Sequence, residues 1–531
     1  MIRNRALRAL GLGAGVVVLA LATAVAVGAR GTSGNIRDGG TLVIGLAEDP
    51  DALDPTLART FVGRIVFLHM CEKLYDLDSK LHIVPQLAAS LPDVSKDKLT
   101  YTIKLRSGVK FNDGTAMDAS SVKASLDRHR TLKGSTRASE LSPVDSIEVT
   151  GPLAIKIHLK VPFSPLTAQL ADRAGMIMSP KQMDALGDKF ASNPVCVGAF
   201  QFKDRVAGDH ITLTKSNVYY NRTKVHLSQI TFRIITDPNA RTQNLRSGDI
   251  QVLDRSQSTD VPTLKKDSSV TVIKTPTIGY QGITINVGNK NGLLKPYENV
   301  GTPLAKSQFL RTAFDLALDR TVINNVVYGG LDQPDCYPIS PVSPWYVTTK
   351  GLQCNLHAQV ATAQKLVKAS GYQTPIKVSL MIGTDPVAAR LGQVIQSMEK
   401  QVGFDVQLQP TEFVSSLAKA DAGKFDTFAV GWSGRVDPDG NIYGFCATPG
   451  TLNDAGFSNA KLDYILNSAR KSTLEKSRIT LYKEAMKIIH RQRPLIYLRH
   501  PVNYYGVSKK ITGVQIFGDG LIRAQFAGFG T

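Results

Sequence analysis

The segment from Gly431 to Asp439 contains the residues whose types and spacing come closest to a reaction centre. Its first five residues resemble the Gly-x-Ser-x-Gly turn that exposes a serine nucleophile in hydrolases, but Arg435 stands where the last glycine belongs. Asp437 and Asp439 supply two carboxylates two residues apart, which suits acid–base chemistry in a cleft. Asp-Pro and Asp-Gly pairs are more typical of turns. The segment therefore predicts a turn and no catalytic residue.

The chain carries no motif for a phosphate group, a metal ion or a cofactor. The sequence contains no glycine-rich phosphate loop, no His-Glu-x-x-His and no Cys-x-x-Cys, and its nine histidines are scattered without a helical pair. We therefore expect no cofactor, no metal site and no enzymatic activity.

Alternating short strands and amphipathic helices surround this segment and predict an α/β protein. Residues 41–47 form a near-continuous apolar run, as expected for a strand buried on both faces. Alternating residues at 101–105 and 155–159, with a turn at Gly151-Pro152, predict instead an antiparallel sheet between residues 99 and 160.

Apolar stripes at helical spacing predict three helices in the second half of the chain. We expect Ser307 to cap the first, with Phe309 in its apolar stripe, and Ser458 to cap the third. The second stripe, at residues 391–398, should end at Gly403 and pass into a strand.

The first 30 residues resemble an export signal. Three arginines precede an uncharged run at residues 9–29, which ends in small residues at the spacing of a cleavage site. Residues 1–29 are therefore expected to form a signal peptide, and an uncleaved membrane anchor is the alternative. The nearest cysteine is Cys71, so the protein is not expected to be an N-terminal lipoprotein.

Composition excludes several classes of protein. The chain has 531 residues, of which 43% are hydrophobic and 20% charged. This excludes a disordered chain and a small disulfide-rich scaffold, and the length predicts two or more globular units. The formal net charge is +19, but the basic residues are spread along the chain without a run of five or more. No nucleic-acid partner is therefore expected.

Export makes disulfide formation plausible for some of the five cysteines. Cys336 and Cys354 lie 18 residues apart, a spacing that suits a loop-closing disulfide, with two free thiols as the alternative. Cys196 and Cys446 form a second pair only if the fold brings them together. Cys71 lies in an apolar stretch and is expected to be a buried thiol.

Several blocks in order make the chain similar to the family 5 extracytoplasmic solute-binding proteins of ABC importers, which include dipeptide, oligopeptide, nickel and opine receptors. The resemblance extends from about Gly40 to about Gly513, and its most specific part is the combination of residues 110–115 with residues 311–320, in this order behind an export signal. The blocks are residues 45–48 with 53–55, 72–76, 105–115, 193–200, 311–320, and 431–432 with 437–439.

The resemblance implies a periplasmic binding protein-like type II fold of α/β class. Two lobes would be joined by a hinge, with an extra β-rich subdomain in the N-terminal lobe. The implied divisions are residues 35–80 and 191–275 for lobe I, 81–190 for the β-rich subdomain, 276–500 for lobe II, and 501–531 for a return to lobe I. The chain would cross between lobes near residues 274–279 and 499–503.

The resemblance also bears on the ligand. In peptide receptors of this family, an aspartate three residues after the tryptophan of a Gly-Trp pair captures the α-amine of the ligand. Arg435 stands at that position here, and a guanidinium repels an ammonium but binds carboxylate or phosphate. We therefore expect either a peptide whose amine Asp437 takes over, or an anionic opine-like or phosphorylated solute. The alternative is that Arg435 points to solvent or pairs with Asp437 or Asp439.

The family resemblance places six residues at the ligand site. Trp432 would offer an apolar platform to a ligand side chain, although an aromatic residue after a buried strand is as often part of the core. The six ligand-binding residues are Glu48, Tyr280, Trp432, Ser433, Arg435 and Asp437.

The function that the resemblance implies is an extracytoplasmic receptor that captures a peptide or peptide-like solute between its lobes. Its partners would be this ligand and the permease and ATPase complex of the importer, and the protein would be a monomer. It would lie in the periplasm or at the cell surface. A non-transport carrier or sensor on the same fold is the alternative.

Overall fold

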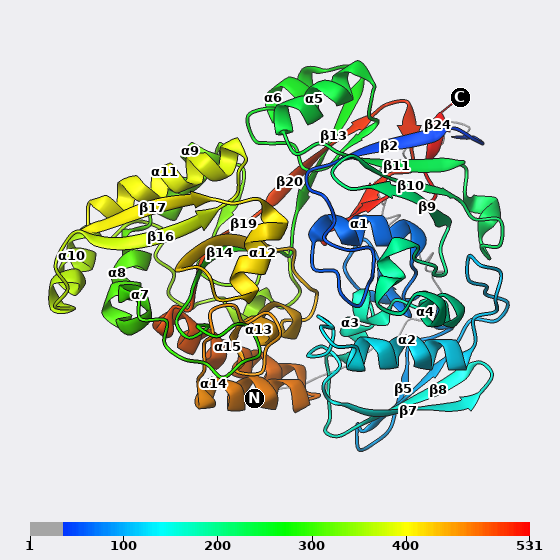
Figure 1. Ribbon diagram of the computed structural model, residues 1–531, viewed down its shortest axis with the longest axis horizontal. Helices are drawn as coiled ribbons and strands as arrows, with labels where there is room; N and C mark the ends of the chain where they lie inside the picture. Colours follow the sequence, from blue (N-terminus) through cyan, green and yellow to red (C-terminus); the bar gives the residue numbers. More distant parts are fainter. Residues whose placement is uncertain (1–35, 531) are drawn as a thin grey trace, which may run out of the picture.

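The computed structural model describes residues 36–530, so the predicted leader at residues 1–29 lies outside the described part. Two bodies lie side by side, each on its own large sheet, with a smaller sheet below one of them in the view of Figure 1. We call the body with the seven-stranded sheet lobe I, the body with the six-stranded sheet lobe II, and the four-stranded sheet with its helices the subdomain. Within residues 36–530, no helix has the length and apolar character needed to cross a membrane.

The lobe I sheet is built around β2, the predicted apolar strand. β2 runs parallel to its two neighbours, and Leu42, Ile44 and Leu46 are fully buried in the core beside it. In order across the sheet, its strands are β13 (Val270–Pro276), β20 (Val502–Ser508), β12 (Val252–Leu253), β2 (Thr41–Leu46), β11 (Gln229–Ile234), β10 (His210–Lys215) and β9 (Phe200–Val206). Its helices are α1 (Phe61–Met70), α5 (Pro238–Ser247) and α6 (Val261–Lys266).

The subdomain contains the predicted antiparallel strands, with a hairpin at Gly151-Pro152. The order of its strands is β5 (Asp93–Val94), β6 (Thr100–Lys104), β8 (Ala154–Leu159) and β7 (Val144–Gly151), and its helices are α2 (Ala119–Thr131), α3 (Leu166–Gln169) and α4 (Pro180–Leu186). Sequence analysis missed α2, which packs against β7 and β8. Its buried face includes the polar residues Ser125 and His129, so the helix shows no clean apolar stripe.

The lobe II sheet is covered by helices on both faces. Along β19, Ile496 and Leu498 belong to the core with α8 to α11, whereas Leu495 and Tyr497 belong to the core with α13 to α15. The order of its strands is β15 (Gln333–Pro334), β19 (Leu495–His500), β14 (Tyr280–Ile285), β18 (Thr427–Trp432), β16 (Ile376–Ile382) and β17 (Phe404–Pro410). Its helices are α7 (Pro303–Lys306), α8 (Gln308–Ala317), α9 (Arg320–Tyr328), α10 (Val360–Ala369), α11 (Pro386–Lys400), α12 (Phe413–Asp421), α13 (Asp439–Cys446), α14 (Ala460–Lys471) and α15 (Glu475–Gln492).

Short strands complete the sheets of the described residues. They are β1 (Ile36–Arg37), β24 (Gly528–Gly530) and β21 (Ile511–Thr512) in one sheet, β22 (Gln515–Ile516) with β23 (Ile522–Arg523), and β3 (Tyr75–Leu77) with β4 (Ile83–Pro85). The strands after β20 carry the end of the chain back onto lobe I, where β24 pairs with β1.

Two predicted helix starts differ in detail. Ser307 caps α8, as predicted. The helix predicted to continue from there is divided into α8 and α9, because the Asp319 side chain accepts a hydrogen bond from the Val322 backbone and starts α9. Phe309 is 54% exposed and lies outside the core. The cap of α14 is Asn459, whose side chain bonds the Leu462 backbone, so the prediction of Ser458 was wrong by one residue.

The chain crosses between the lobes twice, and the two crossings touch. The first runs from β13 to β14 through residues 277–279, and the second runs from β19 to β20 through Pro501. The carbonyl of Pro501 accepts hydrogen bonds from the backbone N–H and the hydroxyl of Thr277, at 3.1 and 2.8 Å. This pair of adjacent short linkers is a suitable hinge for a two-lobed protein.

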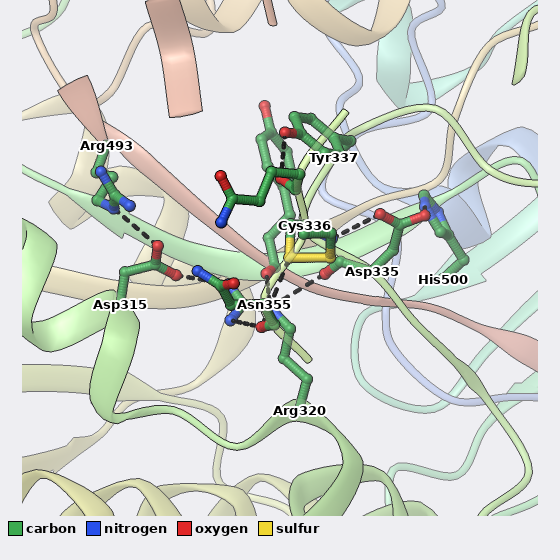
Figure 2. The surroundings of a disulfide bond; sticks show 11 residues. Asp315, Arg320, Asp335, Cys336, Tyr337, Asn355, Arg493 and His500 are labelled. Carbon is green, nitrogen blue, oxygen red and sulfur yellow. Dashed lines mark hydrogen bonds and ion pairs between the residues drawn. A yellow bond between two sulfur atoms is a disulfide. The ribbon is translucent and has the colours of Figure 1, made fainter. Parts of the chain in front are cut away.

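Two disulfides are present in the described residues. One joins Cys336 to Cys354, the pair that the sequence spacing favoured (Figure 2). The other joins Cys71 to Cys196, so the prediction of Cys71 as a buried thiol was wrong. The fold does not bring Cys196 and Cys446 together, which was the condition for their pairing. The reason is topological: Cys71 ends α1 and Cys196 precedes β9 in lobe I, whereas the buried free thiol of Cys446 lies on α13 of lobe II.

Glu72 lies in lobe I between α1 and β3 with its carboxyl group buried. The hydroxyl groups of Tyr219 and Tyr220 donate hydrogen bonds to its two oxygens, at 2.5 and 2.8 Å. Burial nevertheless raises the pKa of Glu72 to about 7. The folded protein therefore favours the neutral carboxyl more than the unfolded chain does.

Glu72→Gln is expected to change how stability depends on pH. The stabilisation that the neutral carboxyl provides is fully present below its ordinary pKa of 4.5 and is lost as pH rises to about 7. At pH 8 the free energy of unfolding of Glu72→Gln should be about 3 kcal/mol higher than that of the wild type. At pH 4.5 the two proteins should have similar free energies of unfolding. Urea unfolding at both pH values measures this. The prediction is contradicted if the stability of the wild type and that of Glu72→Gln depend equally on pH. It is also contradicted if the exposed control Glu475→Gln shows the same gain in stability at pH 8.

Candidate functional site: a cavity between the lobes

A cavity of about 490 Å³ lies between the two lobes and beside the hinge. Its walls come from the residues that follow β2 and β12 in lobe I, from β14 and β18 in lobe II, and from the linker residues Thr277, Gly279 and Pro501. The volume falls within the range of about 300–1,000 Å³ that is typical of small-ligand sites. A ligand there contacts both lobes at once.

Glu48 and Arg255 form the charged wall of lobe I. Each follows a strand of the same parallel pair, β2 or β12, so both lie at one edge of the sheet. Nη2 of Arg255 donates to Glu48 Oε1 at 3.1 Å and to Asp254 Oδ2 at 2.9 Å, and the guanidinium lies 4.7 Å from the Phe61 ring centre. Burial raises the pKa of Glu48, and Arg255 opposes this effect. The side chains of Glu48 and Arg255 are 26% and 27% exposed, so a ligand reaches both charges.

The aromatic wall of lobe II is formed by residues of β14 and β18. Trp432 donates its indole N–H to the Gly440 carbonyl at 3.0 Å and meets the ring of Phe445 edge-on at 4.9 Å between centres. Tyr280 lies deeper and meets Tyr497 edge-on at the same separation. These contacts hold the Trp432 ring in one orientation against the cavity.

Ion pairs connect the lobes beside the cavity. Arg59, immediately before α1 of lobe I, contacts Asp421 at 2.5 Å and Asp454 at 3.7 Å, and both acids belong to lobe II. Burial raises the pKa of Asp454 to about 7, and Arg59 opposes this effect. Since opening would separate Arg59 from both acids, the structure shows the lobes in a closed arrangement.

The six residues assigned to the site by sequence fall into two groups. Four line the cavity: Glu48, Tyr280, Trp432 and Ser433. The other two lie behind this surface. Asp437 is held by Arg478 through two hydrogen bonds of 2.7 and 2.9 Å. Arg435 is only 6% exposed and pairs with Asp172 of lobe I, so it neither points to solvent nor pairs with Asp437 or Asp439.

Sequence analysis missed several charged residues of the cavity, among them Arg59, Arg255 and Asp454. A signal existed for Arg255, because it follows a strand at the same edge as Glu48, but β12 has only two residues and shows no pattern. No local signal marks Arg59 or Asp454, which are brought together from opposite lobes.

Two lobes, two adjacent linkers and a closed cavity between them define a ligand-binding protein of the hinged, two-lobed class. Residues 82–453 match the model of the bacterial extracellular solute-binding proteins, family 5 (middle region). This match covers more than half of the chain, and the chain belongs to that family. Its members are solute-binding proteins.

Individual relatives match this chain over nearly its whole length. The chain is 28% identical to the glutathione-binding protein GsiB of Pectobacterium atrosepticum, over 91% of this chain and 93% of that one. Its structure is similar to AgaA of A. tumefaciens R10 in complex with agropinic acid, with a TM-score of 0.81, 25% identity, and coverage of 92% and 96%. The murein tripeptide-binding protein MppA of Escherichia coli has the same fold, with a TM-score of 0.85, 22% identity, and coverage of 93% and 99%.

Proposed function

We propose that this protein is the exported receptor of an ABC importer and that it holds a short peptide in the cavity between its lobes. The observation that carries the proposal is the exposed pair of Glu48 and Arg255 at one wall of a 490 Å³ interlobe cavity. The glutathione-binding relative supports a peptide ligand.

The charges at this wall suit a peptide terminus. The Glu48 carboxylate accepts hydrogen bonds from an ammonium group, and the Arg255 guanidinium binds a carboxylate. Within residues 36–530, Nη1 of Arg255 has no protein acceptor, since its contacts with Glu48 and Asp254 use Nε and Nη2. A peptide terminus of either sign therefore finds a partner at this wall, an acceptor for an ammonium group or a free donor for a carboxylate.

Ligand capture would work through lobe closure. We propose that residues 276–500 move as lobe II against the remainder, through the linkers at 277–279 and 501. A peptide that contacts Glu48 in lobe I and Trp432 in lobe II binds the closed form better than the open form and shifts the population toward closure. The importer's permease would recognise the closed form of this monomer outside the cytoplasm, and its ATPases would supply the energy.

Arg255→Ala is expected to weaken peptide binding by on the order of 100-fold, because it removes a charged hydrogen bond to a ligand held between the two lobes. Isothermal titration with glutathione and with unmodified di- and tripeptides measures this loss. Peptides with an amidated carboxyl terminus should bind the wild type and the variant with similar, weak affinity.

The matched control is Arg246→Ala, which removes an arginine of lobe I that is 43% exposed, pairs with Asp267 and does not line the cavity. It should bind peptides like the wild type. The proposal is wrong if Arg255→Ala leaves peptide affinity unchanged, or if the wild type binds an opine and no peptide.

A further inference from the structure

Asp172 and Arg435 form a buried ion pair across the boundary between the lobes. Asp172 follows α3, the subdomain helix on the lobe I side, and Arg435 follows β18 in lobe II, and α3 and α13 lie on either side of this boundary (Figure 1). Nε of Arg435 contacts Oδ2 of Asp172, and both side chains are only 7% exposed. Neither residue lines the main cavity.

A second arginine, Arg64 of lobe I, also contacts the Asp172 carboxylate. Nε of Arg64 lies 3.2 Å from Oδ1 of Asp172, and its Nη1 donates to the Ser433 hydroxyl of lobe II at 3.1 Å. Burial by itself acts to raise the pKa of Asp172, but Arg435 and then Arg64 hold it well below its ordinary value. The carboxylate therefore stays charged between the two guanidinium groups.

The Arg435 side chain supports the cavity wall from behind, through Trp432. Its guanidinium lies 4.3 Å from the centre of the Trp432 ring, and Trp432 faces the main cavity. Behind these two stacked side chains lies a separate hollow of about 20 Å³, which Arg435 and Trp432 both line. That hollow holds about one water molecule. Trp432 and Arg435 thus separate the ligand cavity from the interlobe space beyond it.

Protein contacts fill that space. Gln169 of the subdomain donates to Asp439 of lobe II at 3.2 Å, and Nη2 of Arg470 donates to the Ser139 carbonyl at 3.0 Å. A ligand that extended past Trp432 would have to displace Arg435 and these contacts.

We propose that the Asp172–Arg435 pair is an interlobe lock. Like a ligand bound between the lobes, it contacts both lobes and stabilises their closed arrangement. It holds the lobes together and ends the cavity at Trp432, so that it limits the length of the ligand. The limit on length rests on the proposed peptide function, whereas the effect on closure does not.

The first test measures lobe closure without ligand. Asp172→Asn leaves Arg435 and Arg64 buried together without their shared anion, and opening returns both to water. Small-angle X-ray scattering of the ligand-free protein should show a larger radius of gyration for this variant than for the wild type. The matched control is Asp54→Asn, which breaks a buried pair between lobe I and Arg128 on α2 of the subdomain, involves no residue of lobe II, and should leave the radius unchanged.

The second test measures peptide length. Arg435→Ala should join the two cavities, so that peptides too long for the wild type gain at least tenfold in affinity relative to the shortest ligand, a ratio that does not depend on how far lobe closure itself is weakened. Arg435→Met with Asp172→Asn is the second variant, since it removes both charges and retains side-chain volume. This double variant should show the same preference for peptide length as the wild type. Without ligand, its radius of gyration should match that of Asp172→Asn.

Specific results overturn the proposal. They are a ligand-free Asp172→Asn protein as compact as the wild type, equal expansion of the Asp54→Asn control, or an unchanged length preference in Arg435→Ala. If the wild type binds no peptide of any length, the proposed function fails, and the scattering comparison alone then decides whether the lock exists.

Discussion

Replacing Cys71 and Cys196 together with alanine is expected to lower the free energy of unfolding by about 5 kcal/mol, the value that chain entropy assigns to a crosslink of this span. The two cysteines are 125 residues apart in sequence, and the loop they close includes the whole subdomain. Both are buried in the lobe I core, between the end of α1 and the segment before β9. Urea unfolding under non-reducing conditions measures the loss.

Two matched variants of other cysteines calibrate this result. The Cys336–Cys354 disulfide closes a span of only 18 residues, so its removal should cost about 3 kcal/mol. Cys446→Ala removes a buried thiol that closes no loop and should cost less than either pair. A loss for the Cys71–Cys196 pair no greater than that for Cys446→Ala would refute the prediction.

Asp315→Ala is expected to destabilise lobe II by about 3–5 kcal/mol, because it leaves two buried cations without their shared anion. Asp315 accepts hydrogen bonds from Arg320 at 2.6 Å and from Arg493 at 2.7 Å, and all three side chains are at most 10% exposed (Figure 2). Burial by itself raises the pKa of Asp315, but the two arginines hold it below its ordinary value. Thermal and urea unfolding measure the effect.

The same network joins distant segments of lobe II. Arg320 also donates from Nε to the carbonyls of Asp335 and Tyr497, next to the Cys336–Cys354 disulfide. Glu484→Ala is the control, since Glu484 and Lys487 form an exposed pair of the kind that contributes little. Equal stability of Asp315→Ala and Glu484→Ala would show that the buried network does not support the lobe.

Elements with a strong local pattern were predictable. The apolar run of β2, the hairpin at Gly151-Pro152 and the Ser307 cap each depend on residues close in sequence, and each appears in the structure. Helix α2 was not predictable in this way, because its buried face carries Ser125 and His129, whose side chains bond the distant backbone carbonyls of Met178 and Met176 in the folded protein.

The candidate site was predictable in part. Glu48 was assigned through the resemblance, and it also follows a buried strand at an edge where ligands bind in α/β sheets. Arg435 was correctly singled out as unusual, but its partner Asp172 lies in the other lobe, far earlier in the chain. Nothing near Arg435 in sequence indicates that a carboxylate will meet it.

Periodicity and contiguous blocks in the amino-acid sequence are enough to predict the α/β class, the main strands and the family, and a short spacing favours the Cys336–Cys354 pair. Which distant groups meet follows only from the folded chain, as for Cys71 with Cys196, Glu48 with Arg255, and Asp172 with Arg435. The physical reason is that a buried charge needs a partner within a few ångströms, and the fold of both lobes determines which residue provides it.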